Sequence, residues 1–204
     1  MENKAHWENV FLTKTEKEVS WYQEYPQTSV DFIKELKIPQ EAKIIDIGGG
    51  DSHLIDALLE AGYTNLYLLD ISEQAIIRIK NRLGENASKV TFIVSDILDF
   101  KPQIAFDVWH DRASFHFLTK REDIQKYQEI VADAVVSDGN FIIGTFSENG
   151  PKKCSSLDIT QYSVAALEEV FKENFDLISS KILDHKTPFD TVQNFTFCSF
   201  KKHA

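Results

Sequence analysis

A glycine run flanked by acidic residues is the part of this sequence best suited to chemistry. Three glycines, Gly48, Gly49 and Gly50, directly follow a short apolar run that contains Asp46. Glycines let a backbone approach a ligand closely, and the N–H groups of a following helix attract negative charge. An acid about 20 residues further along, here Asp70, is placed to accept both hydroxyls of a ribose. The spacing therefore predicts a nucleotide-like ligand.

Two kinds of ligand fit this pattern. A dinucleotide suits the glycines and Asp70, but its fingerprint has a third glycine near the position of Leu54, which lets helix and strand close on a pyrophosphate. Asp46 stands at the end of a buried strand, where a carboxylate is costly unless it has partners. A cofactor with cationic groups benefits from such acids and a pyrophosphate does not, so the sequence favours a cationic cofactor.

Short apolar runs alternate with helical patterns along the chain. Seven runs are predicted strands: Lys43–Ile47, Leu66–Asp70, Val90–Val94, Phe106–Trp109, Phe141–Ile143, Leu177–Leu183 and Asn194–Phe200. Four helices are predicted between them: Leu54 to Gly62, a helix after the N-cap Ser72, one from a capping box at Thr119 and Glu122 to Gly139, and one after the N-cap Ser163 to about Glu173.

This alternation predicts an α/β fold: a doubly wound, Rossmann-like, mostly parallel sheet with helices on both faces. The last two strands are joined without a helix, so we expect them to form a C-terminal antiparallel hairpin. Residues 1–40 fall outside the alternation. We expect them to form an N-terminal helical cap across the ligand edge of a single domain, whose α/β core spans residues 41–204.

The strand ends select the remaining candidate residues. In an open parallel sheet, ligands bind beyond the carboxyl ends of the strands, near the point where strand order reverses. That rule adds Asp96 after the third predicted strand and the run His110-Asp111-Arg112 after the fourth.

Four segments together resemble a known family. Ile44-Ile45-Asp46-Ile47-Gly48-Gly49-Gly50 is similar to the first motif of class I S-adenosylmethionine-dependent methyltransferases. Three later motifs follow in the family's order, at Asp70-Ile71, at Ser95-Asp96-Ile97 and at Phe106–Arg112. Ser52 stands where the family has its third glycine, and the Asn/Asp-Pro-Pro-Tyr tetrad of base-amine methyltransferases is absent. The resemblance covers roughly residues 40 to 200, and four ordered motifs are more specific than one glycine loop.

The resemblance implies S-adenosylmethionine as cofactor, with S-adenosylhomocysteine as its product. Its implied contacts are the glycine motif from Asp46 to Gly50, Asp70 at the ribose with Ile71 beside it, the Asp96 side chain and Ile97 N–H at the adenine, and His110 and Asp111 near the methyl-transfer end.

The sequence offers no strong constellation for a general base. His116, beyond the fourth strand, is the best single candidate, although a lone histidine among aromatics is more often a core residue. Asp111 has an equal alternative as a surface partner of Arg112 or Lys120. His185, in the predicted loop Asp184–Asp190, is interpreted as a surface histidine.

Three N-terminal aromatics, Trp7, Trp21 and Tyr22, must bury their area somewhere, and we interpret them as packing anchors or as part of a lid over the ligand edge. The expected function is methyl transfer to a small-molecule acceptor enclosed by this segment and two late loops. The alternatives are an NAD(P)-dependent oxidoreductase and a catalytically silent methyltransferase-like module.

Composition narrows the partners. The net charge is -10 and the lysines and arginines form no basic stripe, which argues against duplex nucleic acid. Cys154 and Cys198 lack zinc-ligand spacing, so we expect no metal site, a plain loop thiol at Cys154 and a core residue at Cys198. We see no signal peptide and no membrane span, and we expect a cytoplasmic location. The sequence leaves the oligomeric state open.

Overall fold

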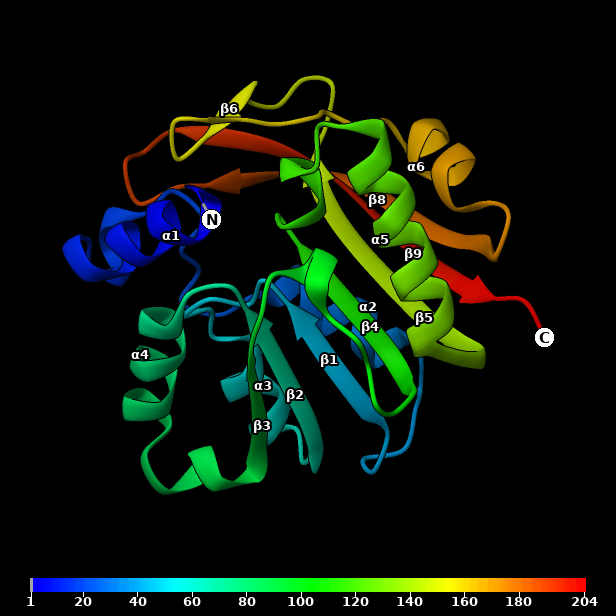
Figure 1. Cartoon of the computed structure of the whole chain (residues 1–204), viewed down its shortest axis with the longest axis horizontal. Helices are drawn as coiled ribbons and strands as arrows, with labels where there is room; N and C mark the ends of the chain where they lie inside the picture. Colours follow the sequence, from blue (N-terminus) through cyan, green and yellow to red (C-terminus); the bar gives the residue numbers. More distant parts are fainter. Residues whose placement is uncertain (1) are drawn as a thin grey trace.

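The strands form one sheet at the centre of the molecule. The computed structural model describes residues 2–204, so Met1, at the start of the expected cap, lies outside the described residues. Within that range seven strands pair in the order β3-β2-β1-β4-β5-β9-β8, and a short β6–β7 ribbon is separate (Figure 1). Their bounds are β1 Lys43–Ile47, β2 Asn65–Asp70, β3 Val90–Val94, β4 Phe106–Arg112, β5 Val135–Phe146, β6 Lys153–Cys154, β7 Leu157–Asp158, β8 Phe175–Lys186 and β9 Val192–Lys202.

The strand directions create the ligand edge. Strands β1 to β5 are parallel, whereas β9 runs antiparallel to both β5 and β8. Strand order reverses between β1 and β4, which leaves a crevice beyond their carboxyl ends. The expected Rossmann-like sheet with its C-terminal antiparallel pair is confirmed.

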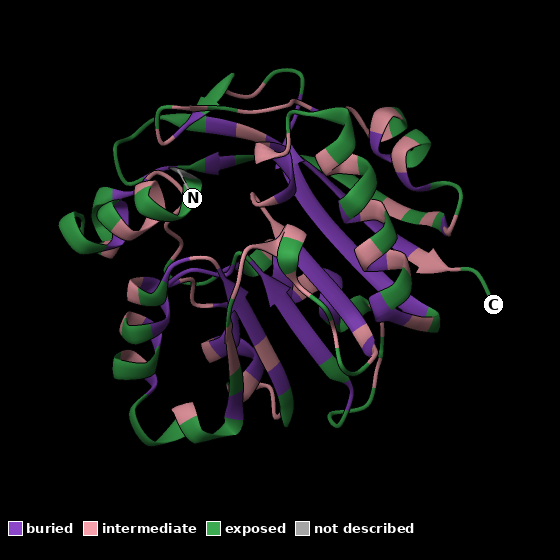
Figure 2. Cartoon of the chain, in the orientation of Figure 1, coloured by how far each residue is buried: buried purple, intermediate pink, exposed green. Residues whose placement is uncertain are grey.

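Helices cover both faces of the sheet. Their bounds are α1 Glu2–Thr13, α2 Gln27–Glu35, α3 Leu54–Glu60, α4 Glu73–Leu83, α5 Arg121–Ala134 and α6 Val164–Phe171, with short 3-10 turns η1 Glu16–Glu18, η2 Gly84–Lys89, η3 Ile97–Asp99 and η4 Phe115–Phe117. One apolar core joins α2, α3 and α4 to the sheet, and a second joins α5 and α6 to its opposite face. Figure 2 shows the central strands buried and the outer surfaces of the helices exposed.

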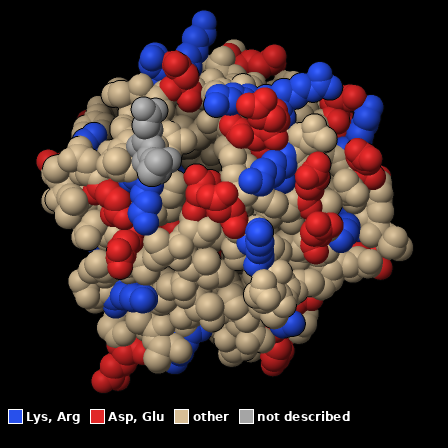
Figure 3. Space-filling view, viewed as in Figure 1, with Lys and Arg blue, Asp and Glu red and all other residues tan. Residues whose placement is uncertain are grey.

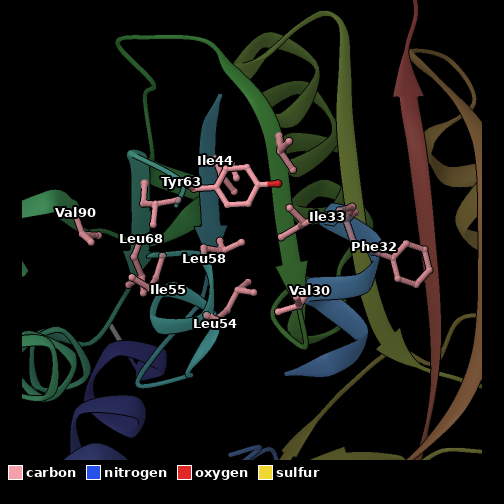
Figure 4. Packing of buried hydrophobic residues seen from close by; sticks show 14 of the residues in the cluster. Val30, Phe32, Ile33, Ile44, Leu54, Ile55, Leu58, Tyr63, Leu68 and Val90 are labelled. Atoms are coloured by element: carbon pink, nitrogen blue, oxygen red, sulfur yellow. The ribbon is translucent and has the colours of Figure 1, made fainter. Parts of the chain in front are cut away.

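The core on the α3 face illustrates the packing (Figure 4). Val30 and Ile33 of α2 and Leu58 of α3 meet Ile44 of β1 and Leu68 of β2, and all five are at most 1% exposed. Each such side chain stabilises the fold by about 1.5–3 kcal/mol relative to an exposed one. This burial holds β1 and β2, and therefore the loop after β1, in a fixed place.

Two of the predicted helix starts are confirmed and one is wrong. Ser72 accepts a hydrogen bond from the Ala75 N–H, and Ser163 accepts one from Ala166, both at 3.2 Å. By contrast, α5 has Lys120 as its N-cap with no side-chain cap, so the proposed Thr119–Glu122 box does not form.

Element ends also differ from the predictions. Helix α5 stops at Ala134, and β5 already runs through Gly139, so that glycine does not end the helix. Helix α6 ends at Phe171, slightly before the predicted Glu173. Strand β4 continues past Trp109 to Arg112, and this extension decides which way its last residues face.

The segment before β1 divides into two parts. Helix α1 and the stretch that ends at Tyr22 lie across the ligand edge, and Figure 1 places α1 next to α4, beyond the strand ends. Helix α2 instead packs on the sheet face with its Val30 and Ile33 side chains buried. The cap prediction therefore describes α1 and its connection but not α2, whose apolar stripe makes it part of the core.

Candidate active site

A cavity occupies the crevice at the carboxyl ends of β1, β2 and β4. The space between its walls, including the part open to solvent, is about 1170 Å³. Its walls come from the glycine loop, from strand ends and from the N-terminal segment.

The glycine loop lies against the cavity in a conformation that only glycine adopts easily. Gly48 has φ +61° and Gly50 has φ +55°. A Cβ on Gly48 would lie 2.6 Å from the Ser114 hydroxyl oxygen. Because both the backbone and the space forbid a side chain, this turn keeps its backbone open to a ligand.

Asp70 fixes this loop and faces the same cavity. Its two carboxylate oxygens accept hydrogen bonds from the Gly50 N–H and the Ser72 N–H, each at 2.8 Å. Burial raises its pKa to about 7, although those two N–H groups lower it, and the nearby charges of Asp51 and Asp46 raise it further. A carboxylate oxygen can accept more than one hydrogen bond, so Asp70 retains capacity for ligand hydroxyls.

Two arginines of α4, neither of them predicted from the sequence, bind the residues that follow the glycine loop. Arg82 donates to the Asp51 carbonyl at 2.7 Å and the Ser52 carbonyl at 2.6 Å, and it pairs with Asp56 at 2.8 Å. Arg78 pairs with Asp51 at 3.2 Å. Their spacing of four along α4, just after Asp70, is the signal that could have revealed them, since such residues share a helix face.

Asp46 heads a buried polar chain. Its Oδ1 lies 2.7 Å from His110 Nδ1, and His110 Nε2 lies 2.8 Å from the Ser29 hydroxyl of α2. Asp46 Oδ2 is buried without a hydrogen-bond partner among the described residues. A buried carboxylate oxygen without a partner is costly, so its place on the cavity wall suits a cationic ligand group.

The third strand end contributes the outer wall. Asp96, Ile97 and Ile71 all line the cavity, as the sequence predicted. The Asp96 carboxylate also caps η3, accepting the Leu98 N–H at 3.0 Å. This cap leaves the backbone of Ile97 at the cavity edge.

Asp111 does not lie on the cavity, which corrects the sequence prediction. It accepts hydrogen bonds from the N–H groups of Ser114 and Phe115 and from the Tyr127 hydroxyl of α5, and it is fully buried. Because β4 runs on to Arg112, strand alternation turns Asp111 toward α5 while His110 and Arg112 face the cavity. Its surface pairing with Arg112 or Lys120 is equally wrong.

His116 is also not on the cavity wall, so it cannot contact an acceptor as a general base. Its Nδ1 accepts the Phe146 N–H at 3.3 Å, and its ring packs against Phe117 and Phe146. Burial, helped by the charge of Arg112, lowers its pKa to about 3. The core interpretation of this histidine is therefore the right one.

His185 is buried rather than on the surface, a second correction. Strand β8 extends to Lys186, so His185 belongs to the strand, and its Nε2 lies 2.8 Å from the Ser20 carbonyl. Burial, together with the charge of Arg112, lowers its pKa. Cys154 is more than a loop thiol, because it lines the cavity from β6, where burial raises its pKa to about 12.

The N-terminal segment closes the cavity from above. Glu8 of α1 caps α4 directly beside Asp70: it accepts the Ser72 hydroxyl at 2.9 Å and the Glu73 N–H at 2.8 Å. Trp7 and Trp21 line the cavity, as the lid interpretation requires, whereas Tyr22 packs on His53. Whether the segment moves stays a prediction.

The charges on one face of the molecule are mixed in sign. On the face in Figure 3, lysine and arginine side chains are interspersed with acidic ones. No group of three metal-ligating side chains, and no helix long and apolar enough to span a bilayer, occurs among residues 2–204.

Comparison with known proteins agrees with this geometry. Residues 45–141 match the family model of the methyltransferase domain. The chain is 27% identical over 126 residues to the eEF1A lysine and N-terminal methyltransferase of Bos taurus, which covers 61% of the chain but 18% of that protein. It is 25% identical over 144 residues to the human EEF1A lysine methyltransferase 2, covering 63% of the chain and 59% of that protein.

Solved structures share the whole fold at low identity. The N-methyltransferase NodS from Bradyrhizobium japonicum, in complex with S-adenosylhomocysteine, has a TM-score of 0.73 at 12% identity, covering 97% of this chain and 98% of NodS. The 1,6-didemethyltoxoflavin-N1-methyltransferase of Burkholderia thailandensis has a TM-score of 0.72 at 17% identity, covering 100% of this chain and 85% of that one.

Fold, motifs and cavity thus define a class of protein that binds a nucleoside cofactor at the glycine loop after β1. Within that class, the methyltransferase-domain match over residues 45–141 and the shared fold make the chain an S-adenosylmethionine-dependent methyltransferase that resembles the class I enzymes. Its residues fit the cofactor of this family. The unpaired Oδ2 of Asp46 suits a cationic group, and the Asp70 carboxylate suits the ribose hydroxyls. The glycine turn has no side chains, so a ligand can lie close to its backbone.

Proposed function

We propose that this chain transfers a methyl group from S-adenosylmethionine to a small-molecule acceptor. The bound cofactor supplies a methyl carbon activated by a sulfonium. The protein contributes position and water exclusion, which matter most for an in-line displacement. Asp70, Asp46 and the glycine loop orient the donor, while α1, Trp7 and Trp21 close the cavity above it.

The observation that carries this proposal is the roofed cavity beyond β4 and β5. Beside the cofactor residues, its walls include aromatic side chains from four separate segments: Trp7, Trp21, Phe117, Phe146 and Phe195. Such an enclosure suits a small, flat acceptor better than a residue on a folded protein surface. Among the described residues, His110 is the one histidine on the wall, and it is already engaged by Asp46 and Ser29. We therefore propose a transfer in which no histidine acts as base.

A second candidate is methylation of a protein amine. The curated relatives named above act on eEF1A, and this supports the candidate by sequence alone. The two functions differ in what they require of the N-terminal segment that covers the cavity. A lysine side chain must reach in from outside, whereas a small molecule can be covered completely.

A labelled-methyl assay separates these functions. Purified chain and S-adenosylmethionine labelled on the methyl group are incubated with a small-molecule library, with lysine-containing peptides and with protein extract. We expect label in the small-molecule fraction. Label only in protein would support the second candidate. Calorimetry with S-adenosylmethionine, NADH and NADPH tests the oxidoreductase alternative, and cofactor binding without any transfer would favour a silent module.

A further inference from the structure

Charge is unevenly distributed around the cavity. Three carboxylates, Asp46, Asp70 and Asp96, line it at the ends of β1, β2 and β3. Arg112, at the end of β4, is the one lysine or arginine on the wall among the described residues. The acidic part suits a cofactor with sulfonium and ammonium groups, which leaves the cationic part to the acceptor.

Arg112 is held rigidly but has no ionic partner. Its Nη1 donates to the Trp21 carbonyl at 3.1 Å, and its guanidinium lies 5.2 Å from the centre of the Phe195 ring. Its Nη2 is buried without a hydrogen-bond partner, and no carboxylate of residues 2–204 lies within 4.0 Å of its guanidinium. Burial lowers its pKa to about 10, so it stays charged at neutral pH.

The groups around Arg112 do not neutralise it. His116 and His185 have lowered pKa values, so both are uncharged at neutral pH, and burial keeps the Cys154 thiol protonated. Asp46 attracts the guanidinium from a distance but is bonded to His110. Arg112 is half-buried, and its Nη2 is fully enclosed. A guanidinium withdrawn from water without an adjacent anion is costly, so this site suits an anionic ligand.

The neighbouring walls indicate the rest of that ligand. Trp7, Trp21 and Phe146 line the same cavity as Arg112 and suit a flat apolar body. Gln193 of β9 also lines it, and its Oε1 is buried with no partner among the described residues. This amide can accept one hydrogen bond from a polar group on the ligand.

We infer that the acceptor is a small carboxylic acid with a flat apolar body, bound through its carboxylate to Arg112. The inference rests on the proposed methyl transfer and adds the substrate class. A protonated lysine side chain would meet a cation here instead of the carboxylate it requires. The carboxylate either positions a different reacting atom or is itself the nucleophile, and product analysis distinguishes the two.

When the carboxylate is itself the nucleophile, the methyl transfer balances without a base. An electron pair on the carboxylate oxygen forms the new bond to the methyl carbon, and the carbon–sulfur bond breaks with its pair remaining on sulfur. The negative acceptor becomes a neutral methyl ester and the sulfonium becomes a neutral thioether. No proton is transferred, so the absence of a free histidine from the described wall does not hinder the step.

Matched ligand pairs test this inference by binding as well as by activity. Benzoate, 2-naphthoate, indole-3-carboxylate and indole-3-acetate are titrated into chain saturated with S-adenosylhomocysteine, each beside its uncharged primary amide. We expect at least one acid to bind tenfold or more tightly than its amide. Arg112→Gln should abolish that preference, Arg112→Lys should keep part of it, and the control Lys89→Gln, an exposed residue on η2 away from the cavity, should leave it unchanged.

Three results would overturn the inference: equal affinity for acids and amides, no binding by any acid, or an acid preference that survives in Arg112→Gln. The proposed function fails separately, because failure of the wild-type chain to bind S-adenosylhomocysteine would remove the methyl-transfer proposal itself. Normal cofactor binding with transfer to lysine peptides would retain the methyltransferase activity and contradict the carboxylate acceptor.

Discussion

The two halves of the cavity are built in different ways. In the cofactor half, consecutive residues at the ends of β1, β2 and β3 contact one another through backbone groups, as where Asp70 accepts the Gly50 N–H. In the acceptor half, groups from distant segments meet through a side chain, as where the Arg112 guanidinium contacts the Trp21 carbonyl and the Phe195 ring. The first half depends on local motifs, and the second depends on tertiary packing.

This difference predicts different responses to mutation. A backbone-built site tolerates few changes, because its glycines and acids define its shape directly. A side-chain-built site can change its specificity by substitution without losing the fold. Variants in the cofactor half should therefore remove binding of the donor, and variants in the acceptor half should alter only the choice of acceptor.

The largest effect is expected at Gly48. Replacement by valine places a branched side chain at φ +61° and drives its Cβ to within 2.6 Å of the Ser114 hydroxyl. Calorimetry should find no cofactor binding. Gly84→Val is the matched control, since Gly84 has φ +55° with open space around it and lies away from the cavity. Similar binding by both variants would make the glycine turn purely structural.

Loss of Asp70, the proposed ribose ligand, should have the next largest effect. Asp70→Ala removes two charge-assisted hydrogen bonds to the ligand, each worth about 1.5–3 kcal/mol, and frees the Gly50 N–H. Cofactor affinity should fall at least tenfold, as measured by calorimetry on protein whose fold is checked by circular dichroism. Asp99→Ala, an exposed acid on η3, should behave as wild type. Unchanged affinity in folded Asp70→Ala would remove this residue from the site.

A pH effect follows from the same residue. Its pKa is raised from 3.8 to about 7 in the folded chain, so its contribution to the free energy of unfolding falls as pH rises from about 4 to 7. Ribose hydroxyls favour the ionised form, so S-adenosylhomocysteine should bind more tightly as pH rises from 6 to 8, with release of protons. Calorimetry in buffers of different ionisation enthalpy measures this release. A flat profile in wild type would contradict the assignment.

The smallest effect concerns the roof of the cavity. Burial raises the pKa of Glu8, but its bonds to the N-terminus of α4 outweigh that and leave it lowered. Glu8→Gln removes a charge from this helix end, worth about 0.3–1 kcal/mol. Amides of α1 should exchange up to a fewfold faster, with less change in Glu85→Gln on η2. Equal exchange in both variants would mean that Glu8 does not hold α1 in place.

The sequence located the glycine loop and the strand-ending acids that line the cavity, because their signals are local. Glycines, strand-ending acids and the Ser72 cap each act within a few residues, so spacing alone locates them. Asp111 was misplaced because β4 continues to Arg112. Side chains alternate between the two faces of the strand, so Asp111 points toward Tyr127 of α5 and away from the cavity. His116 and His185 could not be placed, since their environments come from β5 and from Ser20, far away in the sequence.

Hydrogen exchange with and without S-adenosylhomocysteine tests the division of the cavity most directly. The ligand should protect residues 48–54, 70–75 and 95–99 together with α1, and should leave the exchange of residues 150–158 and 186–192 almost unchanged. That result would place the cofactor in the acidic half and leave the half around Arg112 free for the acceptor. Protection confined to residues 150–158 and 186–192, with none at the glycine loop, would contradict the account.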